Sequence, residues 1–181
     1  MNRRTFGALG ALVAACFLAA PAAAAAAATP SPAANPALRM LSSETTSWMD
    51  SATGRCLDSN AAGKVYTTNP CQAPGNHYQE WVVTDYEFAI EPGSWIYVDQ
   101  IRNLATGRCL DSNTAGQLYT TSPCQTPGNY YQLWYSVEGP SSGNTLKWMN
   151  YQTGRYLDSN TAGSAYASDP NGGDFQNWVK G

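Results

Sequence analysis

The sequence has little of what metal sites and catalytic centres require. His77 is the only histidine, and no two cysteines form a Cys-x-x-Cys pair, so zinc binding is the weaker interpretation of the cysteines. No Ser-His-Asp arrangement stands out, and no pair of unlike carboxylates suited to glycoside hydrolysis does either. We therefore expect no enzymatic activity, no catalytic residue, no metal and no cofactor.

Basic residues are also scarce. The chain has ten lysines and arginines against thirteen aspartates and glutamates, and loss of Arg3 and Arg4 with a signal would leave eight against thirteen. A mildly acidic surface argues against a nucleic acid partner, because phosphate binding needs a basic face. It equally argues against electrostatic attachment to anionic lipid.

The N-terminus has the pattern of an export signal. Arg3 and Arg4 precede an apolar stretch from Phe6 to about Ala20, and a run of alanines with several Ala-x-Ala cleavage points follows. The pattern predicts a signal peptide over residues 1–28, used by the general secretory or the twin-arginine route, and a secreted, extracellular protein. A membrane anchor is the alternative, but the stretch is short and lacks a basic stop-transfer flank.

Cys16 lies inside this apolar stretch. Val13-Ala14-Ala15-Cys16 resembles a bacterial lipoprotein box, but apolar residues 17–20 continue past the cysteine where lipoproteins usually turn polar. We therefore expect no stable membrane anchor, with lipid attachment through Cys16 as the lesser alternative. Residues 29–45 are rich in Pro, Ala and Ser, which predicts a flexible leading segment or a docking tail.

Residues 46–181 contain one unit three times. The motif Thr-Gly-Arg-x-Leu-Asp-Ser-Asn begins at Thr53, Thr106 and Thr153, and its aspartates are 53 and 47 residues apart. Each motif is followed by Ala-Gly, a tyrosine, a proline and Gln-x-Trp. The three copies span about 46–90, 91–140 and 141–181, which makes the repeat the basis of the fold.

The pattern within each copy is strand and turn. In the second copy, residues 95–103, 108–111, 118–121 and 133–137 have strand composition and are separated by turn residues. No window keeps an amphipathic 3.6-residue period for three turns, so we expect little helix. Four strands in each of three copies, too short to bury separate cores, predict an all-β fold, a β-trefoil with pseudo-threefold symmetry; a propeller would need four or more blades.

The alternation of side chains along a strand assigns the faces of each motif. Leu57, Leu110 and Leu157 should point into a shared core, with the neighbouring aspartates on the opposite, outer face and open to solvent. The Gln-x-Trp tryptophans are interpreted as core residues, each contributing on the order of 3 kcal/mol on burial. These tryptophans are Trp81, Trp134 and Trp178.

Four cysteines fit the repeat. Cys56 and Cys71 are 15 residues apart, as are Cys109 and Cys124, and the third copy has Tyr156 and Asn171 at the two corresponding places. Because the third copy lacks both partners together, we predict the disulfides Cys56–Cys71 and Cys109–Cys124, in keeping with an exported protein.

The combination of Gly-x-Cys-Leu-Asp, Pro-Cys about 15 residues later and Gln-x-Trp resembles the ricin B-type lectin family. That family includes xylan- and galactose-binding modules of secreted bacterial hydrolases. The resemblance covers Thr46 to Gly181. It implies a β-trefoil with up to three shallow sugar sites, and in such sites the aspartate after Cys-Leu accepts hydrogen bonds from sugar hydroxyls. Asp58, Asp111 and Asp158 match that position; capping of their own turn is the alternative role.

The remaining site positions depart from the family pattern. Asn69, Ser122 and Asp169 replace the stacking aromatic that the family has two places before the second cysteine, and Tyr78, Tyr131 and Phe175 replace the asparagine before Gln-x-Trp. We expect an aromatic to have moved from one wall of the site to another, with Asn76 and Asn129 supplying the amide.

Tyr66 and Tyr119 are either stacking faces or packing residues. The third copy, which is shorter and lacks the bridge, should have the weakest site. The predicted carbohydrate-binding residues are Asp58, Tyr66, Asn76, Gln79, Asp111, Tyr119, Asn129, Gln132 and Asp158.

These observations favour a carbohydrate-binding protein whose ligand is a glycan or polysaccharide, with several weak sites acting together. The alternative is a module that binds a secreted protein partner, as an adaptor or inhibitor on the same scaffold. The departures from the family pattern motivate this second interpretation.

Overall fold

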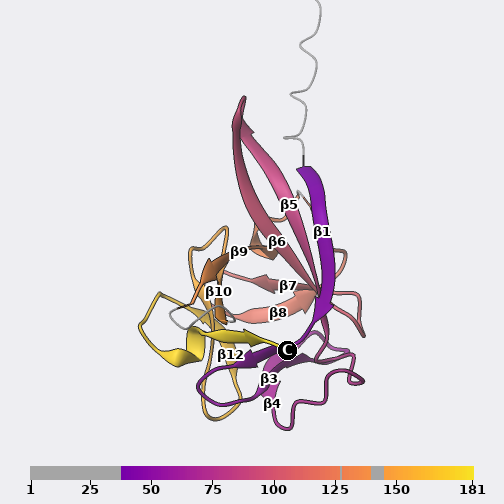
Figure 1. Cartoon of the computed structure of the whole chain (residues 1–181), viewed down its shortest axis with the longest axis vertical. Coiled ribbons are helices and arrows are strands. Elements are labelled where there is room, and N and C mark those ends of the chain that lie inside the picture. The colour runs from indigo at the N-terminus through magenta and orange to yellow at the C-terminus, as the bar shows by residue number, and fades with distance from the viewer. Residues whose placement is uncertain (1–37, 127, 140–144) are drawn as a thin grey trace, which may run out of the picture. The chain divides into compact units, whose positions relative to one another are not determined.

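The computed structural model describes residues 38–126, 128–139 and 145–181. The expected signal peptide, Cys16 and residues 29–37 lie outside the described residues. Thirteen strands and two short 3-10 helices account for the described secondary structure (Figure 1). They are β1 (Leu38–Thr46), β2 (Trp48–Asp50), β3 (Cys56–Ser59), β4 (Val65–Thr68), β5 (Trp81–Glu91), β6 (Ser94–Asn103), β7 (Cys109–Ser112), β8 (Leu118–Thr121), η1 (Tyr130–Gln132), β9 (Leu133–Glu138), β10 (Thr145–Asn150), β11 (Tyr156–Ser159), β12 (Ala165–Ser168), η2 (Asp174–Gln176) and β13 (Trp178–Lys180).

Twelve of the strands form three four-stranded copies, β2–β5, β6–β9 and β10–β13. Long strands of successive copies pair antiparallel, β5 with β6 and β9 with β10, and β13 returns to pair with β2 through Trp178 and Asp50. β1, which pairs with β5 and leads into β2, completes the circuit of strands, and the hairpins β3–β4, β7–β8 and β11–β12 branch from it. The arrangement confirms the predicted β-trefoil, and the strands expected in the second copy agree with β6–β9 within one residue at each end.

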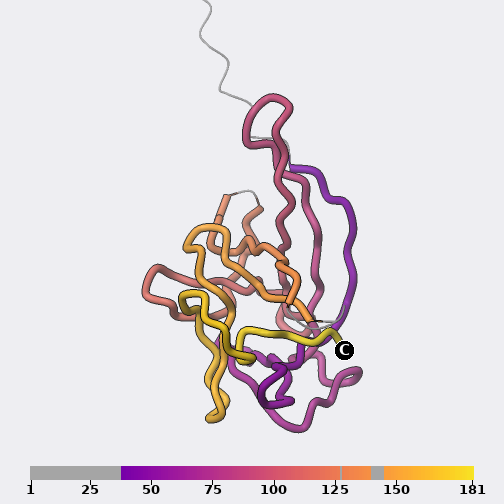
Figure 2. Tube along the Cα trace, turned by 60° about the vertical axis from the view of Figure 1, so that its left-hand side comes forward, coloured from indigo at the N-terminus to yellow at the C-terminus, as the bar shows by residue number. Residues whose placement is uncertain are grey.

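β1 is the strand that the sequence did not predict. Residues 38–45 were expected to belong to a flexible segment, but they pair with β5, from Leu38 opposite Phe88 to Thr46 opposite Trp81. β5 and β6 extend well past the corresponding strands of the other copies, and β1 lies along this long hairpin in Figures 1 and 2. The hairpin has its own apolar cluster around Phe88, against which Leu38 packs, and this packing orders the segment.

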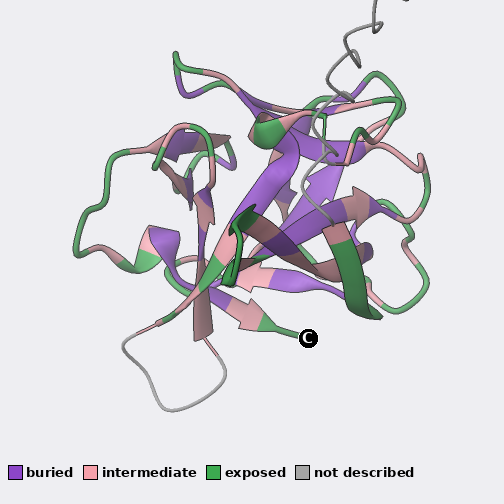
Figure 3. Cartoon of the chain, turned by 90° about the horizontal axis from the view of Figure 1, so that it is seen from above, coloured by how far each residue is buried: buried purple, intermediate pink, exposed green. Residues whose placement is uncertain are grey.

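The core of the trefoil follows the threefold repeat. Leu57, Leu110 and Leu157 are fully buried, as predicted, and Figure 3 shows the buried strand segments gathered inside a rim of exposed loops. The three Gln-x-Trp tryptophans are also fully buried, and each indole Nε1 donates to the carbonyl of the leucine in its own copy at 3.1 Å. The prediction that these tryptophans are core residues is therefore confirmed.

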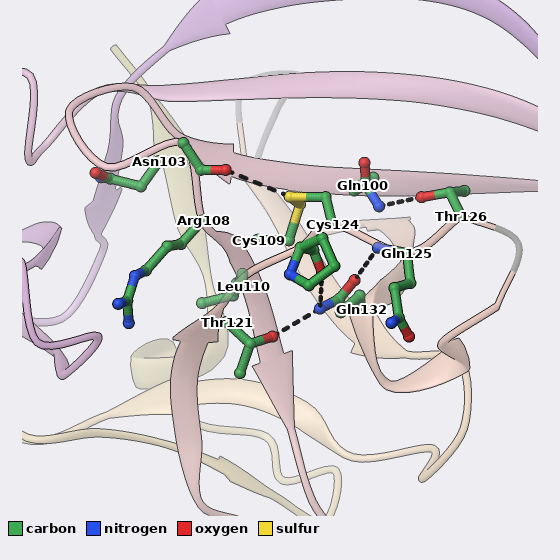
Figure 4. Close-up of a disulfide and its surroundings, with 12 residues drawn as sticks. Gln100, Asn103, Arg108, Cys109, Leu110, Thr121, Cys124, Gln125, Thr126 and Gln132 are labelled. Atoms are coloured by element: carbon green, nitrogen blue, oxygen red, sulfur yellow. Dashed lines mark hydrogen bonds between the residues drawn. A yellow bond between two sulfur atoms is a disulfide. The ribbon is translucent and has the colours of Figure 1, made fainter.

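Both predicted disulfides are present. Cys56 bonds to Cys71 and Cys109 to Cys124, with Cα–Cα distances of 5.2 and 5.4 Å. Each bridge ties the start of the second strand of its copy to the loop that precedes Gln-x-Trp, and Figure 4 shows the second bridge beside Gln132.

We expect the double substitution Cys109→Ala/Cys124→Ala to lower the free energy of unfolding by about 3 kcal/mol, because a loop of this length is constrained in the unfolded chain by the bridge. Guanidinium denaturation followed by circular dichroism measures this. The wild type treated with reductant is the control, since it should lose at least as much. A double variant as stable as the oxidised wild type would contradict the expectation.

The three short hairpins meet at one end of the trefoil and hold one another. Thr67 N donates to Gly163 O, Thr120 N to Gly63 O and Ala167 N to Gly116 O, each at 2.8 Å. The contact requires glycine, because a Cβ on Gly116, whose φ is +80°, would lie 2.4 Å from Ala167 O. Each copy thus bonds to another in a closed ring, which fixes the hairpins relative to one another.

Candidate functional site

A pocket of about 210 Å³ lies on the side of the first copy. Its residues come from the end of β3, the β3–β4 turn, β4 and the loop before β5. Ser59 N donates to Tyr78 O at 3.2 Å, which holds that loop against the hairpin. The lining residues are Asp58, Ser59, Asn60, Ala61, Tyr66, Asn76 and Tyr78. Asp58, Tyr66 and Asn76, which were predicted to bind sugar, therefore meet in one pocket with Tyr78, the aromatic residue that replaces the family's asparagine.

The three motif aspartates were expected to be open to solvent, but the structure shows that they are buried. Asp58, Asp111 and Asp158 are 5%, 4% and 3% exposed. The physical reason is a set of donors that covers each carboxylate: Asp58 Oδ2 accepts from Thr68 Oγ1 at 2.8 Å and from Gln79 Nε2 at 3.1 Å. The same pair of contacts, from a hydroxyl and a glutamine, recurs in the other two copies.

The Gln-x-Trp glutamines hold these aspartates in place. Gln79 is buried, its Oε1 accepts from Gln72 N at 2.6 Å, and its Nε2 donates to Asp58 and Thr68. Figure 4 shows the corresponding contacts of Gln132 with Gln125 and Thr121. Both glutamines were predicted to bind sugar, but their polar atoms are engaged within the protein, so we assign them a positioning role.

The copies differ in how completely the carboxylate is engaged. In the third copy Asp158 Oδ1 accepts from Ser159 N at 2.8 Å, and Oδ2 accepts from Asn171 Nδ2 at 3.0 Å. Both oxygens of Asp158 therefore accept hydrogen bonds, one of them from the adjacent backbone N within β11. In the second copy Asn129 Nδ2 donates to Asp111 Oδ2 at 3.0 Å.

The first copy is hydrogen-bonded differently. Asp58 Oδ1 is buried and has no hydrogen bond of normal geometry within the described part of the chain, although the Tyr66 hydroxyl lies close enough to interact with the Asp58 carboxylate. Asn76 Oδ1 accepts from Tyr78 N at 3.2 Å, as Asn129 Oδ1 accepts from Tyr131 N, but Asn76 Nδ2 does not donate to Asp58. The pocket of the first copy thus offers an amide donor and the Tyr66 hydroxyl beside the carboxylate, and both groups can form hydrogen bonds with the hydroxyls of a ligand.

Two tyrosines form the aromatic walls of this pocket. Tyr78 is 40% exposed and lines the pocket from the loop before β5. Burial, then the charge of Asp58 and a hydrogen bond with it, raise the pKa of Tyr66, so its hydroxyl stays protonated at neutral pH. The hydroxyls of Tyr119 and Tyr166 instead donate to their own chain, at Ser112 O and Ser159 O.

Two sets of residues in the site were missed from the sequence. A hydroxyl residue recurs ten residues after each motif aspartate and donates to it, as Thr68, Thr121 and Ser168 do. Asn60 accepts from Lys64 N at 3.0 Å and shapes the turn that borders the pocket. The fixed ten-residue spacing was the signal that could have identified the hydroxyls.

Among residues 38–126, 128–139 and 145–181, no group of three histidines, cysteines, aspartates or glutamates is placed to hold a metal. The same residues include no helix long and apolar enough to cross a membrane. His77 Nδ1 lies 2.5 Å from Glu80 Oε2, within hydrogen-bond distance, and the His77 side chain is mostly exposed.

Comparisons with known proteins agree with this geometry. The model of the ricin-type β-trefoil lectin domain matches residues 44–178. Among solved structures, the designed threefold-symmetric protein ThreeFoil has a TM-score of 0.56 and 20% identity, covering 75% of this chain and 96% of its own. SeviL, solved bound to the asialo-GM1 saccharide, has a TM-score of 0.53 and 15% identity, covering 76% and 95%. A search of curated proteins found no match.

Proposed function

The chain belongs to the ricin-type β-trefoil lectin family, and on that premise we propose that it is a secreted, non-catalytic protein that binds glycans through the pocket of its first copy. Its two disulfides suit an oxidising compartment. A saccharide is also the ligand in the structure of SeviL. The proposed ligand is a neutral pyranose at the end or on the side of a longer chain.

The observation that carries the proposal is the meeting of Asp58, Asn76 and two tyrosines, Tyr66 and Tyr78, in one pocket. Asp58 Oδ1 is buried beneath this pocket without a hydrogen bond of normal geometry, so we propose that the Tyr66 hydroxyl moves aside and a sugar hydroxyl supplies that hydrogen bond. Gln79 and Thr68 fix the other oxygen, so the acceptor is already oriented when a ligand arrives. Asn76 Nδ2 would donate to a neighbouring hydroxyl, and the rings of Tyr66 and Tyr78 would contact the carbon face of the sugar.

The second and third copies should bind more weakly. Asn129 and Asn171 already donate to the carboxylates of their copies, so a sugar would have to break these contacts before it could bind. The proposal therefore assigns the principal site to the first copy, and residues Asp111, Tyr119, Asn129 and Asp158 to weaker or structural roles.

We expect Asp58→Asn to weaken saccharide binding by about tenfold or more, because a hydrogen bond to a charged group contributes roughly 1.5–3 kcal/mol. Isothermal titration with lactose, xylotriose and chitotriose measures the affinity, and circular dichroism verifies the fold. Asp158→Asn is the matched control, since it makes the same change in a copy whose carboxylate is fully engaged. Equal loss in both variants, or no binding of any of these probes by the wild type, would contradict the proposal.

A further inference from the structure

A second hollow lies where the three short hairpins meet. It measures about 480 Å³, more than twice the volume of the pocket in the first copy, and its lining comes from all three copies. Isolated bridges between Lys64 and Tyr119 and between Tyr66 and Ser164 hold its sides together. We call it the axial depression. Its floor is Val65, Leu118 and Ala165, and its rim includes Lys64, Gln117 and Ser164.

The depression exists because the copies differ at equivalent positions. Val65 and Leu118 are buried, whereas the third copy has only Ala165 at the same place, with a side chain too small to fill the axis. Ser164 is likewise smaller than Lys64 and Gln117, its counterparts. The small side chains of Ala165 and Ser164 therefore leave space on the third copy's side of the hollow.

One cation lines the axial depression, and three more lie near the glycines of the hairpins that form it. Lys64 is exposed, its Nζ lies 6.0 Å from the centroid of the Tyr66 ring, and no carboxylate pairs with it in the described part of the chain. Three guanidinium groups also approach the hairpin glycines: a Cβ on Gly63, Gly116 or Gly163 would lie 2.9, 2.8 or 3.1 Å from an arginine Nη1. These arginines are Arg108, Arg155 and Arg55, respectively.

Lys64 is the one charged residue that lines the axial depression. Asp58 and Asp158 lie near the lining tyrosines, but both carboxylates are buried and accept hydrogen bonds within the protein. The exposed Lys64 ammonium, which pairs with no carboxylate among the described residues, therefore favours an anionic ligand at the rim.

We propose that the axial depression binds a pyranose carrying one negative charge, a carboxylate or a sulfate. Lys64 pairs with the anion, Gln117 and Ser164 form hydrogen bonds with hydroxyls, and the apolar floor and the Tyr166 ring contact the carbons. The volume lies within the range of small-ligand sites, about 300–1,000 Å³. The inference rests on the proposed function only in taking a saccharide as ligand; of the two linings, only Tyr66 is shared.

The repeat itself supplies the test variants. Lys64→Gln places in the first copy the residue that the second copy has at Gln117, and Ala165→Leu places in the third copy the residue found at Leu118. Both side chains are already accommodated at equivalent positions of this fold, so both variants should fold. The first removes the paired cation, and the second fills the floor.

Titration of the ¹⁵N-labelled protein with glucuronate, glucose 6-sulfate and methyl glucoside, followed by amide NMR shifts, tests the inference. Glucuronate or glucose 6-sulfate should shift Gly116 and Gly163, and comparison of the two distinguishes carboxylate from sulfate. Lys64→Gln should weaken this binding at least fivefold, Ala165→Leu should abolish it, and added salt should weaken it. Unmoved axial amides with both anions, or equal affinity for methyl glucoside, would overturn the inference.

The experiment can reject the axial site and the pocket of the first copy independently of each other. Shifts of Asn60 and Asn76 report the pocket of the first copy, and Ala165→Leu, which changes no residue of that pocket or in contact with its tyrosines, should not alter its affinity for lactose, xylotriose or chitotriose. Loss of the axial shifts with intact shifts at Asn76 rejects the axial site alone. Axial shifts with no response at Asn76 to these neutral saccharides support the axial site and reject the proposed function.

Discussion

Replacing Trp134 with alanine is expected to lower the free energy of unfolding by about 4 kcal/mol, since truncation of a buried tryptophan removes its contacts and leaves a cavity. The side chain is fully buried, and its Nε1 donates to Leu110 O at 3.1 Å. Its backbone also pairs with Asp99 of β6 and Asn150 of β10, so the residue lies at the contact of two copies.

Trp95→Ala is the control for this prediction. Trp95 is 46% exposed near the tip of the β5–β6 hairpin, so its loss should change stability by less than about 1 kcal/mol. Thermal unfolding followed by far-ultraviolet circular dichroism should show a midpoint about 10 °C lower for Trp134→Ala, at roughly 2–4 °C per kcal/mol for a chain of this size. Equal midpoints for the two variants would show that the core does not depend on the repeated tryptophans.

The second large effect is a loss of folding stability as the pH rises. Asp99 of β6 lies opposite Asp85 of β5 and is buried. Burial, then the hydrogen bond and negative charge of Asp85, raise the pKa of Asp99 to about 8, although contacts with Ser136 act in the other direction. Asp85 also accepts a hydrogen bond from Ser42 of β1, so the pair lies beneath the strand that the sequence did not predict.

The raised pKa fixes the sign of the effect. A carboxyl group whose pKa rises on folding holds its proton more tightly in the folded state, so its contribution is fully present below about pH 4 and is lost as the pH rises towards 8. The rise from 3.8 to about 8 spans about 4 pKa units, and at ~1.4 kcal/mol per unit the loss is on the order of 6 kcal/mol.

Asp99→Asn should remove this pH dependence while keeping a donor towards Asp85. We therefore expect the wild type to lose more stability than Asp99→Asn between pH 5 and pH 9, with the variant the more stable of the two at pH 9. Urea denaturation at both pH values measures the difference. Parallel pH profiles for the two proteins would show that Asp99 is ionised at neutral pH.

Most of the fold could be predicted because the same sequence motif occurs three times. Three copies of one motif gave the strand order, the leucine and tryptophan core positions and the pairing of the cysteines. β1 could not be predicted, because residues 38–45 gain order only from the long hairpin of β5 and β6, and the Pro- and Ala-rich segment before them masked the strand. Its stability comes from packing of Leu38 on another segment and not from its own composition.

The residues of the site could be predicted from the sequence, but their hydrogen bonds could not. The sequence identified Asp58 and Asn76, yet their counterparts Asp111 and Asn129 have the same side chains and a different hydrogen-bond pattern. Whether an asparagine closes on the aspartate or faces a pocket depends on the position of a surface loop, which motif spacing does not encode. Burial of the aspartates also depends on Gln79 and Thr68, which reach them from other segments.

The ring of hairpin contacts affects how the chain can acquire its structure. Gly163 accepts from Thr67 and Ala167 donates to Gly116, so the last copy completes bonds for both of the earlier ones, and β13 supplies the partner of β2. Partners so distant along the chain make for slow folding. During synthesis the first two copies therefore lack these partners until residues up to Trp178 have emerged, and their unpaired strand edges stay accessible to proteases and chaperones until then.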